Sequence, residues 1–336
     1  MRLTMNNSNS RVQTVAVVYN PIKVDVDEMR AAVTAAARTI DNLRLLWFST
    51  TADDPGFGQT REALANGATL VLAAGGDGTV RPVAEALKDT DAILGIIPSG
   101  TGNLLARNLG IPLSSLEEAC AVALSGATRT IDSGLITLTR ANAERSGVDF
   151  LVIAGIGADA QMIANTNSDL KKHLGWLAYV DAGLRSLSAV RKHSIEFRVD
   201  HGGWRSAHVH SILFANCGLL PGNIELIPDG AVDDGLLDIV LLQPASVWGW
   251  LAIWRKVTWE NRVLRKTSLG RKIIRFTDRS TRTHLSYLRG SEVELRLKEP
   301  APFQIDGDSC GDVTALEVRV DHLGLRVRVP EETDTD

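Results

Sequence analysis

The chain has 336 residues, of which 44% are hydrophobic and 23% are charged, and its net charge is −4. This composition is typical of a globular protein with room for two medium domains, and the small charge argues against nucleic acid as a partner. Residues 1–10 lack a signal-peptide stretch, no apolar run approaches the roughly 20 residues of a membrane span, and the three cysteines form no Cys-x-x-Cys pair, so we expect a cytoplasmic protein with reduced thiols.

In chain order, the first third alternates predicted strands with predicted helices. Apolar runs predict strands at residues 12–19, 43–49, 69–74 and 92–97. Helical spacing of apolar residues predicts helices near residues 27–40, 58–66, 80–88 and 115–124. This alternation is typical of a doubly wound, mostly parallel α/β sheet with helices on both faces. We place this domain at residues 11–131.

Two glycine-rich turns follow two of these strands. Gly75-Gly76-Asp77-Gly78-Thr79 follows the third strand, and Pro98-Ser99-Gly100-Thr101-Gly102-Asn103 follows the fourth. Glycine lets the backbone approach a ligand, and the start of the next helix presents free N–H groups, so each turn is a candidate phosphate site. Both turns should emerge at the same edge of a parallel sheet. An ordinary tight turn is the alternative for each, and neither has the spacing of a Walker A or dinucleotide-binding loop.

The pattern changes after about residue 129. Polar and apolar residues alternate at 194–200, 291–298 and 316–321, which predicts antiparallel strands with one face toward water. Helical stretches are expected near residues 170–190 and 245–266. We therefore predict that the α/β domain is followed by an antiparallel β-rich, sandwich-like domain at residues 132–321.

The two turns, the opening segment Val15–Pro21 and three later segments together resemble one known family. The later segments are Gly155-Ile156-Gly157-Ala158-Asp159-Ala160, Asp233-Asp234-Gly235-Leu236-Leu237-Asp238 and Gln304-Ile305-Asp306-Gly307-Asp308. In this order, from about Val12 to about Val329, they are similar to the diacylglycerol kinase catalytic-domain family, which includes bacterial lipid kinases and the sphingosine and ceramide kinases. The resemblance implies a lipid kinase that depends on ATP and Mg²⁺. It also implies that the final strands, residues 322–330, complete the first domain.

Polar residues after the first two strands extend the candidate nucleotide site. Asn20 follows the first strand and Thr50 and Thr51 follow the second, so we expect them on the same sheet edge as the two turns. The segment Ile22-Lys23-Val24 stands where the resembled family usually carries Ser-Gly and a basic residue, and a simple strand stop is the alternative for Asn20-Pro21. The candidate ATP-binding residues are Asn20, Pro21, Lys23, Thr50, Thr51, Gly75, Gly76, Asp77, Gly78, Thr79, Ser99, Gly100, Thr101, Gly102 and Asn103.

The turn Asp306-Gly307-Asp308 carries the candidate catalytic base. The resembled family usually has Asp-Gly-Glu here, and its last carboxylate removes the proton of the lipid hydroxyl, which implies this role for Asp308. An aspartate is one methylene shorter, and a misplacement of about one ångström can lower the rate about a hundredfold. Asp77 and Asp159 are the implied helpers, which orient the base or hold Mg²⁺ through water. A helix N-cap is the alternative for Asp159.

The acidic turn at residues 229–238 holds four carboxylates in ten residues. Mg²⁺ prefers oxygen ligands, which such a turn can supply. The corresponding turn of the resembled family forms a structural metal site from one aspartate side chain and nearby carbonyls. This implies a site made by Asp234 with the carbonyls of Ala231 and Leu236. A solvated hairpin turn is the alternative.

Residues 248–275 combine tryptophans with basic residues. Four tryptophans lie within twelve residues, and eight Lys or Arg follow between Arg255 and Arg275. Indole rings favour the membrane–water boundary and basic side chains attract anionic headgroups, so this stretch is the candidate for peripheral contact with the inner face of the membrane. A packed helix with a basic solvent side is the alternative.

The leading hypothesis is transfer of the γ-phosphate of ATP to a lipid hydroxyl, with a diacylglycerol-like or sphingoid acceptor. A non-catalytic nucleotide or lipid sensor is the alternative from another class. An NAD kinase, which shares the Gly-Gly-Asp-Gly-Thr loop, is a less favoured enzyme. Lipid pockets are lined by generic apolar residues, so the sequence does not select the acceptor. It does not set the oligomeric state either, although a homodimer is compatible with it.

Overall fold

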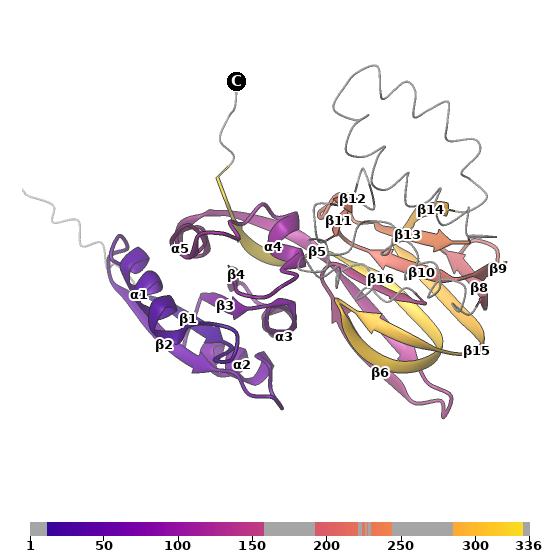
Figure 1. The fold of residues 1–336 in the computed structure, drawn as a ribbon, viewed down its shortest axis with the longest axis horizontal. Helices are drawn as coiled ribbons and strands as arrows, with labels where there is room; N and C mark the ends of the chain where they lie inside the picture. The colour runs from indigo at the N-terminus through magenta and orange to yellow at the C-terminus, as the bar shows by residue number, and fades with distance from the viewer. Residues whose placement is uncertain are drawn as a thin grey trace, which may run out of the picture. The chain divides into compact units, whose positions relative to one another are not determined.

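The computed structural model describes residues 12–157, 192–220, 224–225, 227, 230–243 and 285–331. The chain forms two compact units, one of residues Met1–Thr130 with Leu325–Asp336 and one of residues Ile131–Gly324. We refer to them as unit 1 and unit 2. The helices predicted near residues 170–190 and 245–266 lie outside the described residues. The described elements confirm the predicted fold class, an α/β unit and a β-rich unit (Figure 1).

Unit 1 is built on a parallel sheet. Its first four strands lie in the order β4-β3-β1-β2, and the end of β16 adds a further parallel strand beside β4, where Val327 pairs with Leu94. The strands are β1 (Gln13–Tyr19), β2 (Leu43–Ser49), β3 (Leu70–Gly75), β4 (Ile93–Pro98) and β16 (Asp308–Val329). All six residues of β3 are buried, which is expected for a central strand that is covered on both faces.

Helices cover both faces of this sheet. They are α1 (Val26–Ala37), α2 (Phe57–Ala65), α3 (Asp77–Leu87), α4 (Leu104–Asn108) and α5 (Leu116–Ser125). On one face α1 packs with α5, and their apolar side chains, such as Met29 and Leu124, join Val15 and Leu72 of the sheet in one core. On the other face α2 packs with α3. Asp25 and Ser115 cap α1 and α5 by accepting backbone N–H groups of the first turn.

Unit 2 is antiparallel. Along its main path the strands lie in the order β14-β13-β10-β7-β15-β16; β8 pairs with β15 and β9, and β5 pairs with β16 and β6. The additional strands are β5 (Ala127–Thr139), β6 (Arg145–Phe150), β7 (Ile153–Ile156), β8 (His193–Val199), β9 (Arg205–Val209), β10 (Ser211–Ala215), β13 (Leu237–Leu242), β14 (Leu285–Gly290) and β15 (Glu292–Ile305), with β11 (Leu219–Leu220) and β12 (Ile224–Glu225) as a separate pair. Its core contains the buried side chains of Phe150, Phe214 and Phe303.

The predicted elements of unit 1 agree closely with the structure, with one informative difference. The four predicted strands begin and end within one residue of β1 to β4. The third helix, however, begins at Asp77, three residues before the predicted start. Gly76 has an extended backbone and acts as the N-cap, so half of the predicted loop forms the first turn of α3.

Candidate functional site

The carboxyl ends of the four strands are joined by backbone hydrogen bonds. The Thr50 N–H donates to the Tyr19 carbonyl at 2.9 Å, the Asn20 N–H to the Ala74 carbonyl at 3.0 Å, and the Ser99 N–H to the Gly75 carbonyl at 2.8 Å. These bonds run in order across β2, β1, β3 and β4. All the candidate ATP-binding residues lie in or directly after these strand ends, so the structure brings them to one edge, which we call the strand-end edge.

The two glycine-rich turns are packed directly against each other. A Cβ atom added to Gly100 would lie 2.6 Å from the Gly76 Cα atom, and one added to Gly76 would lie 3.2 Å from the Gly100 Cα atom. A Cβ atom added to Gly75 would lie 2.7 Å from the hydroxyl oxygen of Thr79, whose side chain is buried. Contact between the turns therefore requires glycine at positions 76 and 100, and contact with Thr79 within the first turn favours it at position 75.

Asp77 links the first turn to the helix that follows the second. Its Oδ1 accepts the Leu104 N–H at 2.7 Å, so this carboxylate caps α4 from 27 residues earlier in the chain. Burial raises the pKa of Asp77, while hydrogen bonds from the backbone of Leu104, Leu105 and Asn103 act in the opposite direction. The prediction that Asp77 assists catalysis stays a prediction. The capping contact was missed from the sequence because no local pattern marks it.

Asn103 and Arg107 fix the shape of the second turn. Asn103 has a left-handed backbone with φ of 48°. Its side-chain oxygen accepts the Gly100 N–H at 2.9 Å, and its amide nitrogen donates to the Gly100 carbonyl at 2.7 Å. Arg107 Nε donates to the Gly102 carbonyl at 2.7 Å. The turn is thus held in one conformation by the protein's own groups, which lowers the entropy that a ligand must remove on binding.

The remaining predicted nucleotide contacts differ in exposure. Thr50 is buried, whereas Thr51, Pro21 and Lys23 are exposed. The Asn20 side chain accepts the Ile22 N–H at 3.0 Å and shapes the segment that carries Lys23. Thr51 closes a short turn by accepting the Asp54 N–H at 3.0 Å. Lys23 is an exposed cationic side chain at this edge, of the kind that can pair with a phosphate.

In unit 2, the two aspartates of the predicted base motif lie in different environments within the turn between β15 and β16. Asp306 and Gly307 have φ values of 47° and 95°, as a two-residue hairpin turn of the Asp-Gly type requires, and Ile305 pairs with Asp308. The Asp306 carboxylate is buried and accepts three backbone N–H groups, from Leu151, Val152 and Ile153, at 2.9 to 3.0 Å. Asp308 is exposed. Asp306 is thus a structural anchor, whereas the role of Asp308 as the base stays a prediction.

Asp132 is a second buried anchor that sequence reasoning missed. It is fully buried on β5 and accepts the N–H groups of Gly235 and Leu323 at 2.7 Å each, while His322 Nδ1 lies 2.8 Å from its Oδ1. The carboxylate therefore ties the acidic turn to the segment near the end of unit 2. A lone acid within the apolar stretch of β5 was the available signal, because a buried carboxylate requires partners.

In the structure, the residues of the acidic turn are not arranged as the metal site that the family resemblance implies. Asp234 pairs with Arg289 of β14, and its Oδ1 accepts the Leu236 N–H at 3.1 Å. Arg289 Nε lies 3.1 Å from Asp238 Oδ1. Burial alone would lower the pKa of Arg289, but the contacts with Asp234 and Asp238 outweigh it and raise the pKa. The carboxylate that would bind the metal already faces a permanent positive charge.

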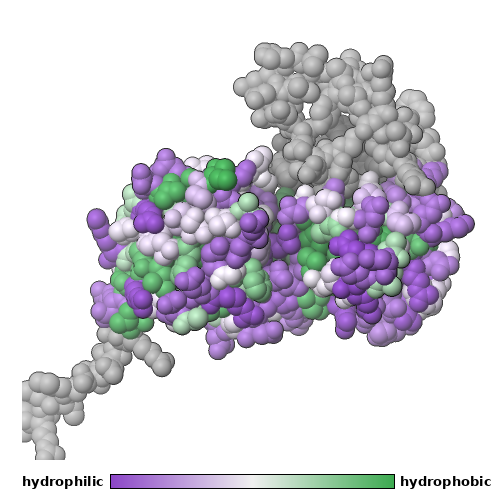
Figure 2. Space-filling view, turned by 90° about the horizontal axis from the view of Figure 1, so that it is seen from below, coloured by the Kyte–Doolittle hydropathy of each residue, from purple (hydrophilic) through white to green (hydrophobic). Residues whose placement is uncertain are grey.

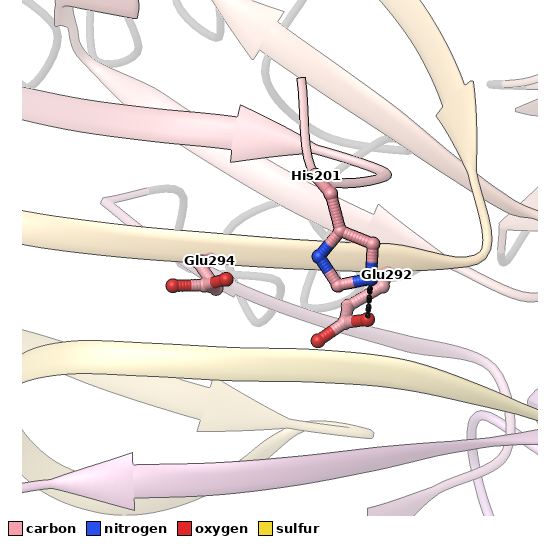
Figure 3. Close-up of side chains that lie close together, drawn as sticks. All are labelled: His201, Glu292 and Glu294. Carbon is pink, nitrogen blue, oxygen red and sulfur yellow. Dashed lines mark ion pairs between the residues drawn. The ribbon is translucent and has the colours of Figure 1, made fainter. Parts of the chain in front are cut away.

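His201, Glu292 and Glu294 bring ligand-type atoms within 4.8 Å of one another in the described part of unit 2 (Figure 3). His201 Nε2 lies 3.3 Å from Glu292 Oε2. Glu294, however, accepts from Arg198 Nε at 2.7 Å, so a guanidinium neutralises one of the two carboxylates. We assign no metal to this group.

Two predicted features lie outside the described residues, namely Asp159 and the docking stretch at residues 248–275. No described helix is long and apolar enough to cross a membrane. Exposed large hydrophobic residues of the described chain, such as Ile22, Trp204 and Leu323, are far apart in sequence. Figure 2 shows small hydrophobic areas separated by hydrophilic ones on the face in view.

Comparison with known proteins places both units in one family. Residues 14–136 match the family model for the diacylglycerol kinase catalytic domain, and residues 151–328 match that for the YegS C-terminal NAD kinase beta sandwich-like domain. A probable lipid kinase YegS-like from Pseudomonas aeruginosa is 38% identical over 221 residues, which cover 64% of this chain and 68% of the relative. A diacylglycerol kinase from Bacillus subtilis is 28% identical over 274 residues, 81% of each chain.

Solved structures with low sequence identity support the fold. A putative diacylglycerol kinase from Bacillus anthracis superimposes with a TM-score of 0.69 at 19% identity, covering 97% of this chain and 98% of that one. A yeast NADH kinase superimposes with a TM-score of 0.54 at 8% identity, covering 97% of this chain and 86% of that one. Taken with the two family models, the glycine-rich turns and the Asp306–Asp308 hairpin, these similarities show that the chain belongs to the diacylglycerol kinase family, among its YegS-like lipid kinases.

Proposed function

We propose that this lipid kinase transfers the γ-phosphate of ATP to the hydroxyl group of a diacylglycerol-like or sphingoid lipid. The observation that carries the proposal is the strand-end edge of unit 1, where two interlocked glycine-rich turns meet the polar ends of β1 and β2. A helix that begins at such a turn directs N–H groups and the positive end of its dipole toward an anion. At α3 this end is Gly76 and Asp77, where the N-cap residue has no side chain to cover it.

In this proposal the nucleotide phosphates lie against Gly75–Thr79 and Ser99–Asn103, and Lys23 adds a positive charge. Asp77 keeps the two turns together through the Leu104 N–H. Mg²⁺ bound with ATP would neutralise part of the phosphate charge. Phosphoryl transfer depends mostly on positioning and charge stabilisation, so a rigid set of turns favours it.

Asp308 is proposed as the base that accepts the proton of the lipid hydroxyl. It is exposed at the start of β16, and its neighbour Asp306 fixes the turn from which it projects. Asp159 is proposed as its helper. The lipid would remain in the membrane while residues 248–275 make peripheral contact with the inner face, since tryptophan and basic side chains favour that boundary.

The proposal is tested by incubating the full chain with γ-labelled ATP, Mg²⁺ and vesicles that contain diacylglycerol, phosphatidylglycerol, ceramide or sphingosine. Labelled lipid is expected with the wild type, and a loss of at least about a thousandfold is expected for Asp308→Asn. Asp312→Asn is the matched control, because Asp312 is an exposed aspartate of the same strand. Full activity of the Asp308 variant would exclude this base.

The same assay separates the alternatives. Labelled product with NAD in place of a lipid would favour an NAD kinase. Binding of ATP without transfer to any acceptor would favour a sensor.

A further inference from the structure

A positively charged side chain of the protein, that of Arg289, contacts the acidic turn of unit 2. Arg289 lies directly opposite Asp238 in the antiparallel pairing of β14 with β13. Its guanidinium pairs with Asp234, and its Nε lies 3.1 Å from Asp238 Oδ1. One side chain therefore bridges the aspartate of the turn and the aspartate of the strand that follows.

The two carboxylates differ in exposure: the Asp238 side chain is 9% exposed, whereas the side chains of Asp234, at 27%, and of Arg289, at 41%, lie at the surface. A carboxylate as buried as that of Asp238 requires a nearby positive charge or several hydrogen bonds. The planar, permanently charged guanidinium suits this task, since its several donors can reach two acceptors at once.

The backbone of the turn is also held by protein groups. The Leu236 N–H donates to Asp234, and the Gly235 N–H donates to the buried Asp132 at 2.7 Å. A divalent ion at Asp234 would have to displace the guanidinium or lie beside it, and like charges at contact distance repel each other. The contacts that a metal ion would provide are thus replaced by contacts of the chain.

We propose that Arg289 occupies the cation position of this turn, so that the chain holds residues 231–238 in place without a bound divalent ion. The family resemblance implies a metal at Asp234, and this structure departs from that expectation. The inference concerns the fold of unit 2 and is independent of whether Asp308 acts as the base.

The test is the thermal unfolding of the full chain, free of nucleotide, in EDTA and in about 10 mM MgCl₂. The wild-type Tm is expected to differ by less than about 1 °C between the two buffers. Arg289→Gln is expected to lower the Tm in EDTA by roughly 5 °C, and Mg²⁺ is expected to restore at least about half of this loss, because the vacated carboxylates can then bind the ion.

Arg145→Gln is the control, because it removes an ion pair of unit 2, with Glu317 at 2.8 Å, away from the turn. Its Tm is expected to be the same in both buffers. Arg289→Lys keeps a positive charge and should stay insensitive to Mg²⁺, and it replaces the glutamine variant if that variant does not fold. The proposal is overturned if EDTA lowers the wild-type Tm and Mg²⁺ restores it, or if Mg²⁺ fails to stabilise a folded Arg289→Gln variant.

Discussion

The strand-end edge of unit 1 and the acidic turn of unit 2 are both rich in polar groups, yet they use them in opposite ways. The strand-end edge is shaped by glycine contacts and by hydrogen bonds to the backbone, to which Asp77 and Arg107 contribute singly rather than as a pair of opposite charges. At the acidic turn, side chains of opposite charge pair with one another, as Asp234 and Asp238 do with the single guanidinium of Arg289. The two regions thus differ in what holds them: backbone contacts in the first, and an ion pair between side chains in the second.

The largest effect expected on ATP binding tests the packing of the two turns. Gly100→Ala would place a methyl group 2.6 Å from the Gly76 Cα atom, where only backbone can move. We expect ATP affinity to fall by at least about a hundredfold, since a displacement of about one ångström disturbs every contact of the site. Titration calorimetry with an ATP analogue and Mg²⁺ measures this. Gly147→Ala, at a glycine with open space around it, is the control and should bind normally.

An intermediate effect is expected on the free energy of unfolding, and it distinguishes the two aspartates of the β15–β16 turn. Asp306→Asn should lower the free energy of unfolding by about 3 kcal/mol, because charge-assisted bonds to buried N–H groups are lost or weakened. Asp308→Asn should change it by less than about 0.5 kcal/mol, as expected for an exposed residue. Urea unfolding of both variants measures these changes. Equal destabilisation by the two substitutions would contradict the assignment of Asp306 as an anchor and of Asp308 as the base.

The smallest effect concerns the pH dependence of Asp77. Its pKa is raised above the ordinary value of 3.8, so the folded state binds its proton more tightly than the unfolded state does. The contribution of this group to stability therefore falls as pH rises from about 3.8 through the higher folded pKa. The Tm of the wild type minus that of Asp77→Asn should decrease over this window. An increase would show that the backbone bonds from Leu104 and its neighbours outweigh burial.

The sequence was sufficient for the elements of unit 1 and for the residues that lie after its strands. The spacing of apolar residues, the positions of the glycines and the order of the predicted strands and helices can all be read directly from the sequence. In a parallel sheet the carboxyl ends of the strands then meet at one edge. The start of α3 was wrong by three residues, because Gly76 caps the helix without a recognisable capping side chain.

The contacts that were missed join residues far apart in the chain. The bond from Leu104 to Asp77 spans 27 residues, that from Leu151 to Asp306 spans 155, and Arg289 meets Asp234 across 55. Such pairs are set by packing of the completed fold, and neither propensity nor periodicity indicates them. The sequence could therefore locate carboxylates in motifs, but it could not divide them into anchors and groups that remain available to a substrate.

The proposal depends most on binding of the ATP phosphates by the two glycine-rich turns. The most direct measurement is the change in backbone amide NMR signals when a non-hydrolysable ATP analogue and Mg²⁺ are added to the full chain. The account predicts that the largest changes fall on Gly75–Thr79 and Ser99–Asn103. Saturable binding that leaves both turns unchanged and shifts signals elsewhere would contradict it.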